Sequence, residues 1–201
     1  MTNAQEIRTT INSIPIGEPF VSSQLFALGS RNCIDQTLYR LEREGSISRV
    51  ARGIYVRPKL NRFVGAVLPT PFKVAKKLST LTNETVQVNG AEAARQLGLS
   101  TQVPTKPIYW TTGQNRRFRI GEQEIILKHV PARKLACAGS LAGLAISALW
   151  YLGKEAVTIG TLQTIKKQMP TEEYQKFKAA IHQMPIWLAK LLQKFEGNNN
   201  V

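Results

Sequence analysis

The strongest constraint on the fold is an apolar repeat inside the stretch from Ser22 to Arg57. Ile34, Leu38 and Leu41 recur at i, i+4 and i+7, the spacing at which side chains share one face of an α-helix. A serine precedes the run as an N-cap and a glycine follows it, so the sequence predicts a helix over residues 30–44. Its apolar face should pack inward.

The opposite face of this predicted helix is polar. Its residues carry amide, hydroxyl and guanidinium groups, which are the groups that hydrogen-bond to base edges in the major groove of DNA. They are Arg31, Asn32, Gln36, Tyr39, Arg40 and Arg43.

Shorter elements flank this helix. Residues 22–28 predict a short helix capped by Ser22, with Gly29 in the turn, and residues 3–14 predict a first helix. Ile7, Ile11, Ile14, Leu25 and Phe26 of these two helices are expected in the same core.

After the polar helix, residues 46–50 and 54–56 predict a hairpin. Arg52 lies at its tip and Arg49 at its base, positions from which cations contact phosphates. Three helices followed by a basic hairpin predict a winged helix-turn-helix that binds DNA. The alternatives are a helix and hairpin with ordinary solvated charges, or a winged helix used for protein contact.

Prolines at 58, 69 and 71 interrupt any continuous helix or central strand, so we expect a domain junction there. The predicted limits are a winged helix-turn-helix domain at 1–60, a linker at 61–70, a C-terminal domain at 71–196 and a disordered tail at 197–201. The expected fold class is α+β, with a mixed α/β C-terminal domain that ends in helices.

The C-terminal domain should contain a small sheet. The sequence predicts helices at 72–81 and 90–97 and a strand at 86–88. It also predicts a strand meander formed by 107–112, 116–120 and 124–130, with a turn at 121–122. Its cations are Arg116, Arg117, Arg119 and Lys128. They form either a solvated face or a binding face for an acidic partner or nucleic acid.

Residues 135–152 contain no charge and have glycine or serine at 139, 143 and 147, a spacing seen between membrane helices. Eighteen residues are the lower limit for a membrane span, so we expect a buried central helix instead. Two amphipathic helices are predicted beyond it, over 171–183 and 185–195.

Charge and composition limit the function. The chain has 27 Lys and Arg against 13 Asp and Glu, a net charge of +14, which favours a polyanionic partner such as double-stranded DNA. No signal peptide begins the sequence and the two cysteines are isolated, so we expect a cytoplasmic protein without membrane, metal or cofactor. Paired catalytic carboxylates and nucleotide-binding motifs are missing from the sequence, and we expect no enzyme.

Three segments carry a family resemblance: SRVARGIYVRP at 48–58, VNGAEAARQLGLSTQVPTKPIYWTTG at 88–113 and RRFRIGEQEIILKHV at 116–130. With the apolar ALWYLGKEAV at 148–157, their order resembles antitoxins of bacterial type IV toxin–antitoxin systems, the abortive-infection E class. The resemblance covers roughly residues 5–160, and the run from Gly98 to Gly113 is its most specific part.

This resemblance implies an autorepressor that binds DNA repeats at its own promoter through the N-terminal domain. It also implies a C-terminal domain that antagonises a nucleotidyltransferase-like toxin, and the cations at 116, 117, 119 and 128 would serve that contact. The helices over 171–195 depart from the resemblance. A free-standing winged-helix regulator, or a nucleic-acid adaptor without a toxin partner, is the alternative.

Overall fold

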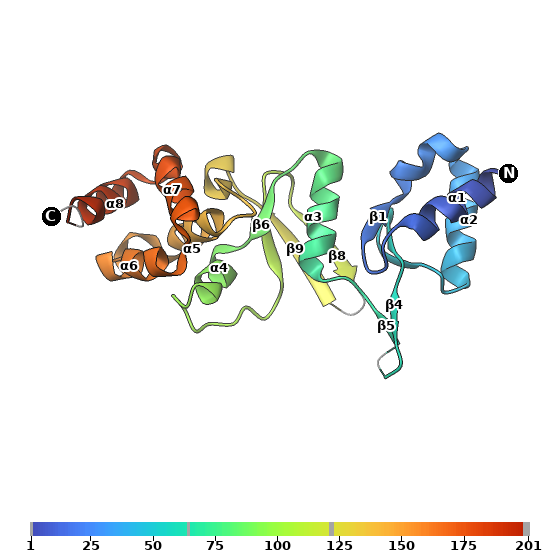
Figure 1. Cartoon of the computed structure of the whole chain (residues 1–201), viewed down its shortest axis with the longest axis horizontal. Helices are drawn as coiled ribbons and strands as arrows, with labels where there is room; N and C mark the ends of the chain where they lie inside the picture. Colours follow the sequence, from blue (N-terminus) through green and yellow to red (C-terminus); the bar gives the residue numbers. More distant parts are fainter. Residues whose placement is uncertain (1, 64, 121–122, 199–201) are drawn as a thin grey trace. The chain divides into compact units, whose positions relative to one another are not determined.

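The protein has a mixed α+β fold, seen in a computed structural model that describes residues 2–63, 65–120 and 123–198 (Figure 1). Its internal contacts divide the chain into two compact units. The N-terminal unit comprises residues 1–81 with 117–125, and the C-terminal unit comprises 82–116 with 126–201. The predicted domain limits differ from this grouping, which adds residues 71–81 and 117–125 to the first unit.

The N-terminal unit begins with helix α1 (Asn3–Ser13), strand β1 (Pro19–Val21), 3₁₀ helix η1 (Ser22–Leu28) and helix α2 (Arg31–Arg43). Strands β2 (Ser48–Ala51) and β3 (Ile54–Val56) follow as a hairpin, and β1 joins it to give an antiparallel sheet in the order β1-β3-β2. The buried core between helices and sheet consists of Ile7, Ile11, Phe20, Leu25, Ile34, Leu38, Leu41, Ile47 and Tyr55.

Two local predictions about this unit were wrong. The segment after Val21 is a 3₁₀ helix, and its Ser22 backbone N–H donates to Gly53 O at 3.0 Å while no side chain caps it. Because a 3₁₀ turn holds three residues, side chains one turn apart eclipse and the α-helical spacing does not apply. Phe26, expected in the core, is therefore 50% exposed, whereas Leu25 is buried.

The junction after β3 has structure of its own. Strands β4 (Lys59–Asn61) and β5 (Gly65–Val67) pair as an antiparallel hairpin within the segment predicted as a linker. Helix α3 (Pro71–Thr82) follows and buries Val74 and Ala75. Pro71 opens this helix, the position where its missing N–H costs nothing.

A second sheet has the order β6-β7-β9-β8, from strands β6 (Val86–Val88), β7 (Ile108–Thr111), β8 (Arg116–Ile120) and β9 (Gln123–His129). Strand β9 pairs parallel to β7, with Ile108 opposite Ile126, so β9 lies between β7 and β8. The predicted meander is therefore wrong in its order, although its strands are present. The turn predicted at 121–122 lies outside the described residues.

The C-terminal unit packs its helices around α5 (Leu141–Ala156) (Figure 1). The others are α4 (Gly90–Gln96), α6 (Ile159–Gln168), α7 (Thr171–Ala179) and α8 (Ile186–Asn198), with 3₁₀ helices η2 (Ala132–Leu135) and η3 (Ala180–Gln183). Gly90 allows α4 to lie against α5, since a Cβ there would be 2.5 Å from Ser147 O.

The apolar segment 135–152 supplies a buried helix, as predicted, but the helix begins later than expected. Ser140 caps it by accepting the Gly143 N–H at 3.1 Å, and Gly153 interrupts it with φ +74°. No helix within the described ranges has the length and apolarity needed to cross a membrane. Helix α6 was not predicted, and α8 continues through Gly197, where a disordered tail was expected; residues 199–201 lie outside the described part.

Candidate nucleic-acid interface

Helix α2 presents its polar face to solvent. Ser30 Oγ accepts the Cys33 N–H at 3.3 Å, which fixes the first turn, and the apolar face lies in the core. The six side chains predicted for base contact are all exposed: Arg31, Asn32, Gln36, Tyr39, Arg40 and Arg43. They line the side of the helix opposite Ile34, Leu38 and Leu41.

Acidic side chains accompany this face, which the sequence reading did not take into account. Asp35 lies 3.8 Å from Arg31 Nε and Glu42 is exposed one residue before Arg43. An exposed ion pair such as Arg31 with Asp35 contributes little stability, about 0–1 kcal/mol. It does reduce the local positive potential around Arg31.

A groove of about 570 Å³ separates α2 from the β2–β3 hairpin; we call it the helix–hairpin groove. It brings the predicted cations of the hairpin, Arg49 and Arg52, to the same opening as Arg31 and Tyr39. Its lining is Ser22, Arg31, Asp35, Tyr39, Glu42, Arg49, Arg52, Gly53 and Tyr55. Both hairpin arginines are exposed, so the two elements offer a continuous polar surface.

The hairpin is held by backbone geometry. Gly53 has φ +73°, a conformation that L side chains rarely adopt, and its carbonyl accepts the Ser22 N–H. A register shift between Arg49 and Ala51 bends β2. These contacts place the hairpin beside α2 without help from its arginine side chains.

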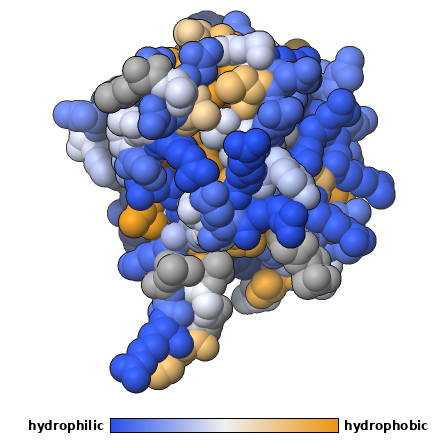
Figure 2. Space-filling model, turned by 90° about the vertical axis from the view of Figure 1, so that its right-hand side faces the viewer, coloured by the Kyte–Doolittle hydropathy of each residue, from blue (hydrophilic) through white to orange (hydrophobic). Residues whose placement is uncertain are grey.

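Helix α1 is tied to the end of α2 by an ion pair that the sequence did not reveal. Arg8 donates two hydrogen bonds to the Glu44 carboxylate, at 3.0 and 2.8 Å. The hydrogen bond from Arg8 lowers the pKa of Glu44. Figure 2 looks onto the side of the N-terminal unit on which these helices lie, and its surface is mainly hydrophilic, with separate hydrophobic areas.

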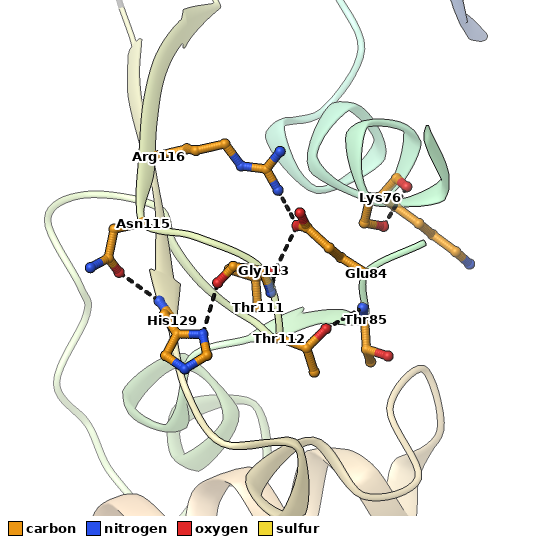
Figure 3. A network of polar contacts seen from close by, with 10 residues as sticks. Lys76, Glu84, Thr85, Thr111, Thr112, Gly113, Asn115, Arg116 and His129 are labelled. Carbon is orange, nitrogen blue, oxygen red and sulfur yellow. Dashed lines mark hydrogen bonds and ion pairs between the residues drawn. The ribbon is translucent and has the colours of Figure 1, made fainter. Parts of the chain in front are cut away.

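The four cations predicted as a second surface do not have equal roles. Arg117, Arg119 and Lys128 are exposed, as a binding face requires. Arg116 is half-buried and forms an ion pair with Glu84, which also accepts a hydrogen bond from Thr111 Oγ1 at 3.1 Å (Figure 3). The contact grouping assigns Arg117 and Arg119 to the N-terminal unit, and Arg116 and Lys128 to the C-terminal unit.

The Glu84 network continues along the ends of β7 and β9. Thr111 Oγ1 accepts the Gly113 N–H at 3.0 Å, and His129 Nδ1 lies 2.8 Å from Gly113 O, which as a carbonyl must accept (Figure 3). Asn115 Oδ1 accepts the His129 backbone N–H at 2.7 Å. An open pocket of about 740 Å³ borders the network.

Gly113 leaves room for this arrangement, because a Cβ at that position would overlap the end of the Glu84 side chain as it lies here. The network therefore positions its own members, and we interpret it as structural.

The described residues contain no group of three or more His, Cys, Asp and Glu side chains that could hold a metal ion. Cys33 and Cys137 are free and half-buried, and burial raises the pKa of Cys137, which disfavours the reactive thiolate.

None of the curated proteins matches this chain. Among solved structures, the RV2827C protein from Mycobacterium tuberculosis aligns over 96% of this chain and 82% of its own, with 14% identity and a TM-score of 0.40. A similarity at that level supports no inference about this chain. A family model matches residues 6–177 and describes a family of unknown function, DUF6088. The chain therefore belongs to the DUF6088 family.

Proposed function

We propose that this protein is a DNA-binding autorepressor that acts in the cytoplasm as the antitoxin of a type IV toxin–antitoxin system. In this function the N-terminal unit is a winged helix-turn-helix, with α2 as the recognition helix and the β2–β3 hairpin as the wing. The C-terminal unit antagonises a nucleotidyltransferase-like toxin.

One observation carries the DNA-binding part. Arg31 and Tyr39 from the exposed polar face of α2 border the same helix–hairpin groove as the two exposed arginines of the hairpin. A helix that reads base edges and a basic hairpin that lies along phosphates need this adjacency. A helix with merely solvated charges does not require a basic hairpin at its side.

The antitoxin part rests on the sequence resemblance over residues 5–160. Arg117 and Arg119 of the N-terminal unit and Lys128 of the C-terminal unit are exposed cations, whose charge suits an acidic partner. A free-standing regulator is the second candidate, because Arg117 and Arg119 group with the N-terminal unit, whose own role is DNA contact.

The test of DNA binding uses the full chain and a duplex from the region upstream of its own gene, with a scrambled duplex of equal length. Asn32→Ala and Gln36→Ala should each lose about 1–3 kcal/mol of discrimination on the upstream duplex alone. Arg52→Ala should weaken binding to both duplexes alike. It should also reduce, by about one, the slope of the logarithm of the binding constant against the logarithm of the salt concentration. Gln163→Ala, an exposed glutamine on α6, is the matched control. Equal losses on both duplexes for Gln36→Ala would mean that this face of α2 does not read bases.

The antitoxin role has its own experiment. Arg117→Glu with Arg119→Glu should abolish growth rescue in cells that express a neighbouring nucleotidyltransferase-like toxin, while DNA affinity at 0.15 M salt stays within a few-fold. At this ionic strength, charges more than about 8 Å apart are screened. Loss of specific DNA binding with rescue intact would favour the free-standing regulator. Gln36→Ala is the reciprocal control, expected to keep rescue and lose repression.

A further inference from the structure

The β4–β5 hairpin is an isolated two-stranded sheet. Its strands pair from Lys59 opposite Val67 to Asn61 opposite Gly65, and no third strand joins them in the described part of the chain. Asn61 Oδ1 accepts the Phe63 N–H at 2.8 Å and Gly65 has φ +71°, which together shape the turn. Lone hairpins are marginally stable in water, so this one gains stability when a partner covers it.

The base of the hairpin is clamped to the N-terminal unit. Arg57, which follows β3 directly, donates from Nη1 to Asn12 O at 2.6 Å and to Ile14 O at 2.7 Å. Its own carbonyl accepts the Gly17 N–H at 2.8 Å. The chain therefore leaves the β1-β3-β2 sheet at a fixed point, and the hairpin extends away from α1 and α2 (Figure 1).

The hairpin tip combines a bare aromatic ring with cations. Phe63 is 91% exposed, the most exposed large hydrophobic side chain in the described residues; Arg62 beside it is exposed, as is Lys59 at the base of the hairpin. Figure 2 shows the hairpin as the downward projection, with both hydrophilic and hydrophobic surface at its end. A single exposed apolar side chain is ordinary on a protein surface, so this ring indicates a contact only together with the cations of the same hairpin.

The charge around the hairpin selects the partner. Residues 45–83 contain no Asp or Glu and eight cations, which are Arg49, Arg52, Arg57, Lys59, Arg62, Lys73, Lys76 and Lys77. By contrast, α2 carries Asp35 and Glu42 among its basic residues. Lys73 lies 3.7 Å from Glu18, but the two cations of the hairpin project from a segment without acids. This imbalance favours a polyanion over an apolar protein surface.

We propose that the β4–β5 hairpin is a second DNA-contacting element, which holds the duplex next to the segment bound by α2. Lys59 and Arg62 contact phosphates, and Phe63 enters the minor groove, where apolar side chains unstack a base step and bend the duplex. This role rests on the DNA binding proposed above and adds affinity and bending to it.

The experiment measures full-chain binding to a 40-base-pair duplex from its own upstream region and to a scrambled duplex, at several salt concentrations. Phe63→Ala should lose at least about fivefold in affinity on both duplexes, the factor that corresponds to about 1 kcal/mol. Arg62→Ala and Lys59→Ala should each reduce the salt slope by about one. Phe63→Leu should retain most of the affinity, and Val103→Ala, which truncates another exposed apolar side chain, should change nothing.

Bending provides a readout that a general loss of affinity would not change. The native protein should retard circularly permuted DNA fragments according to the position of the site, and saturating Phe63→Ala should remove this dependence. The minor-groove ligand netropsin should compete with the native protein and less with Phe63→Ala. Circular dichroism verifies that each variant is folded.

The outcomes separate the two proposals. If the native chain binds no duplex at 0.15 M salt, both the proposed function and the hairpin role fail. If the native chain binds but Phe63→Ala keeps its affinity and bend, the hairpin role alone is overturned. It is equally overturned if Phe63→Ala leaves DNA binding intact and changes the sedimentation coefficient or toxin rescue, since the tip would then be a protein contact.

Discussion

The Glu84 network makes a quantitative prediction about the C-terminal unit. Glu84→Ala removes the acceptor for both Arg116 and the buried hydroxyl of Thr111. The Arg116 Nε is already buried without a hydrogen-bond partner among the described groups. The substitution therefore leaves a guanidinium with no compensating charge.

The size of the effect follows from burial. The side chains of Glu84 and Arg116 are 15% and 30% exposed. Removing one partner of a fully buried pair costs about 3–5 kcal/mol, because the other charge remains desolvated. Nearly a third of Arg116 stays in water, which rehydrates part of it, so we expect a loss of about 1–3 kcal/mol in the free energy of unfolding.

Urea unfolding of the full chain measures this loss. With a slope of about 2 kcal/mol per molar, the midpoint should fall by about 0.5–1.5 M. Glu172→Ala, an exposed glutamate on α7, is the matched control and should stay within about 0.5 kcal/mol. A double-mutant cycle with Arg116→Met should give a coupling of about 0.5–3 kcal/mol.

Two results would refute the structural role of the network. One is an unchanged midpoint for Glu84→Ala. The other is an Arg116→Met variant that keeps its stability but fails to rescue cells from the toxin, which would return Arg116 to the partner surface.

Four further substitutions test the fold. Leu38→Ala empties a fully buried position and should cost about 2–5 kcal/mol, measured by urea unfolding. Gly143→Ala would drive a Cβ into the backbone of the turn before α5 and should destabilise the fold. Gly160→Ala in α6 would place a Cβ in ordinary contact with Thr158 Oγ1, at 3.5 Å, and should stabilise by up to about 1 kcal/mol. Equal effects of the two substitutions would be inconsistent with the helix contacts. The hydrogen bond from Lys176 lowers the pKa of Glu173 in the folded chain. The ionised carboxylate therefore stabilises the fold above the pKa that Glu173 has in the unfolded chain, and this stabilisation is lost as the pH falls through its pKa in the folded chain. The melting temperature of Glu173→Gln should lie below that of the native chain at pH 7, and the two should converge once the pH falls below the folded pKa of Glu173.

Sequence patterns were sufficient where the structural cause is local. The burial of Ile34, Leu38 and Leu41 and the cap at Ser30 follow from spacing and from one nearby N–H group. Helix α6 could have been found in the same way, since Thr158 caps it and its apolar residues Leu162 and Ile165 are three apart. That omission was an incomplete reading of a signal that is present.

Pairing between distant segments was not readable from the sequence. Strand β9 inserts between β7 and β8 because backbone hydrogen bonds join residues that no local pattern relates. The β4–β5 hairpin occupies a segment whose prolines indicated only a break. Arg116 was predicted as a free cation, yet Glu84 lies 32 positions before it in the chain.

The sequence by itself determined the positive charge, the α+β composition and the two faces of α2, because each depends on residue type or on spacing within a few turns. Only the tertiary structure decided which cations remain exposed, that the β2–β3 hairpin lies beside α2, and that Phe63 projects into solvent while Leu25 is buried. These features depend on which surfaces meet when the chain folds. Contacts between residues distant in sequence decide whether a side chain is buried and which partner it has. A local sequence pattern does not predict these contacts.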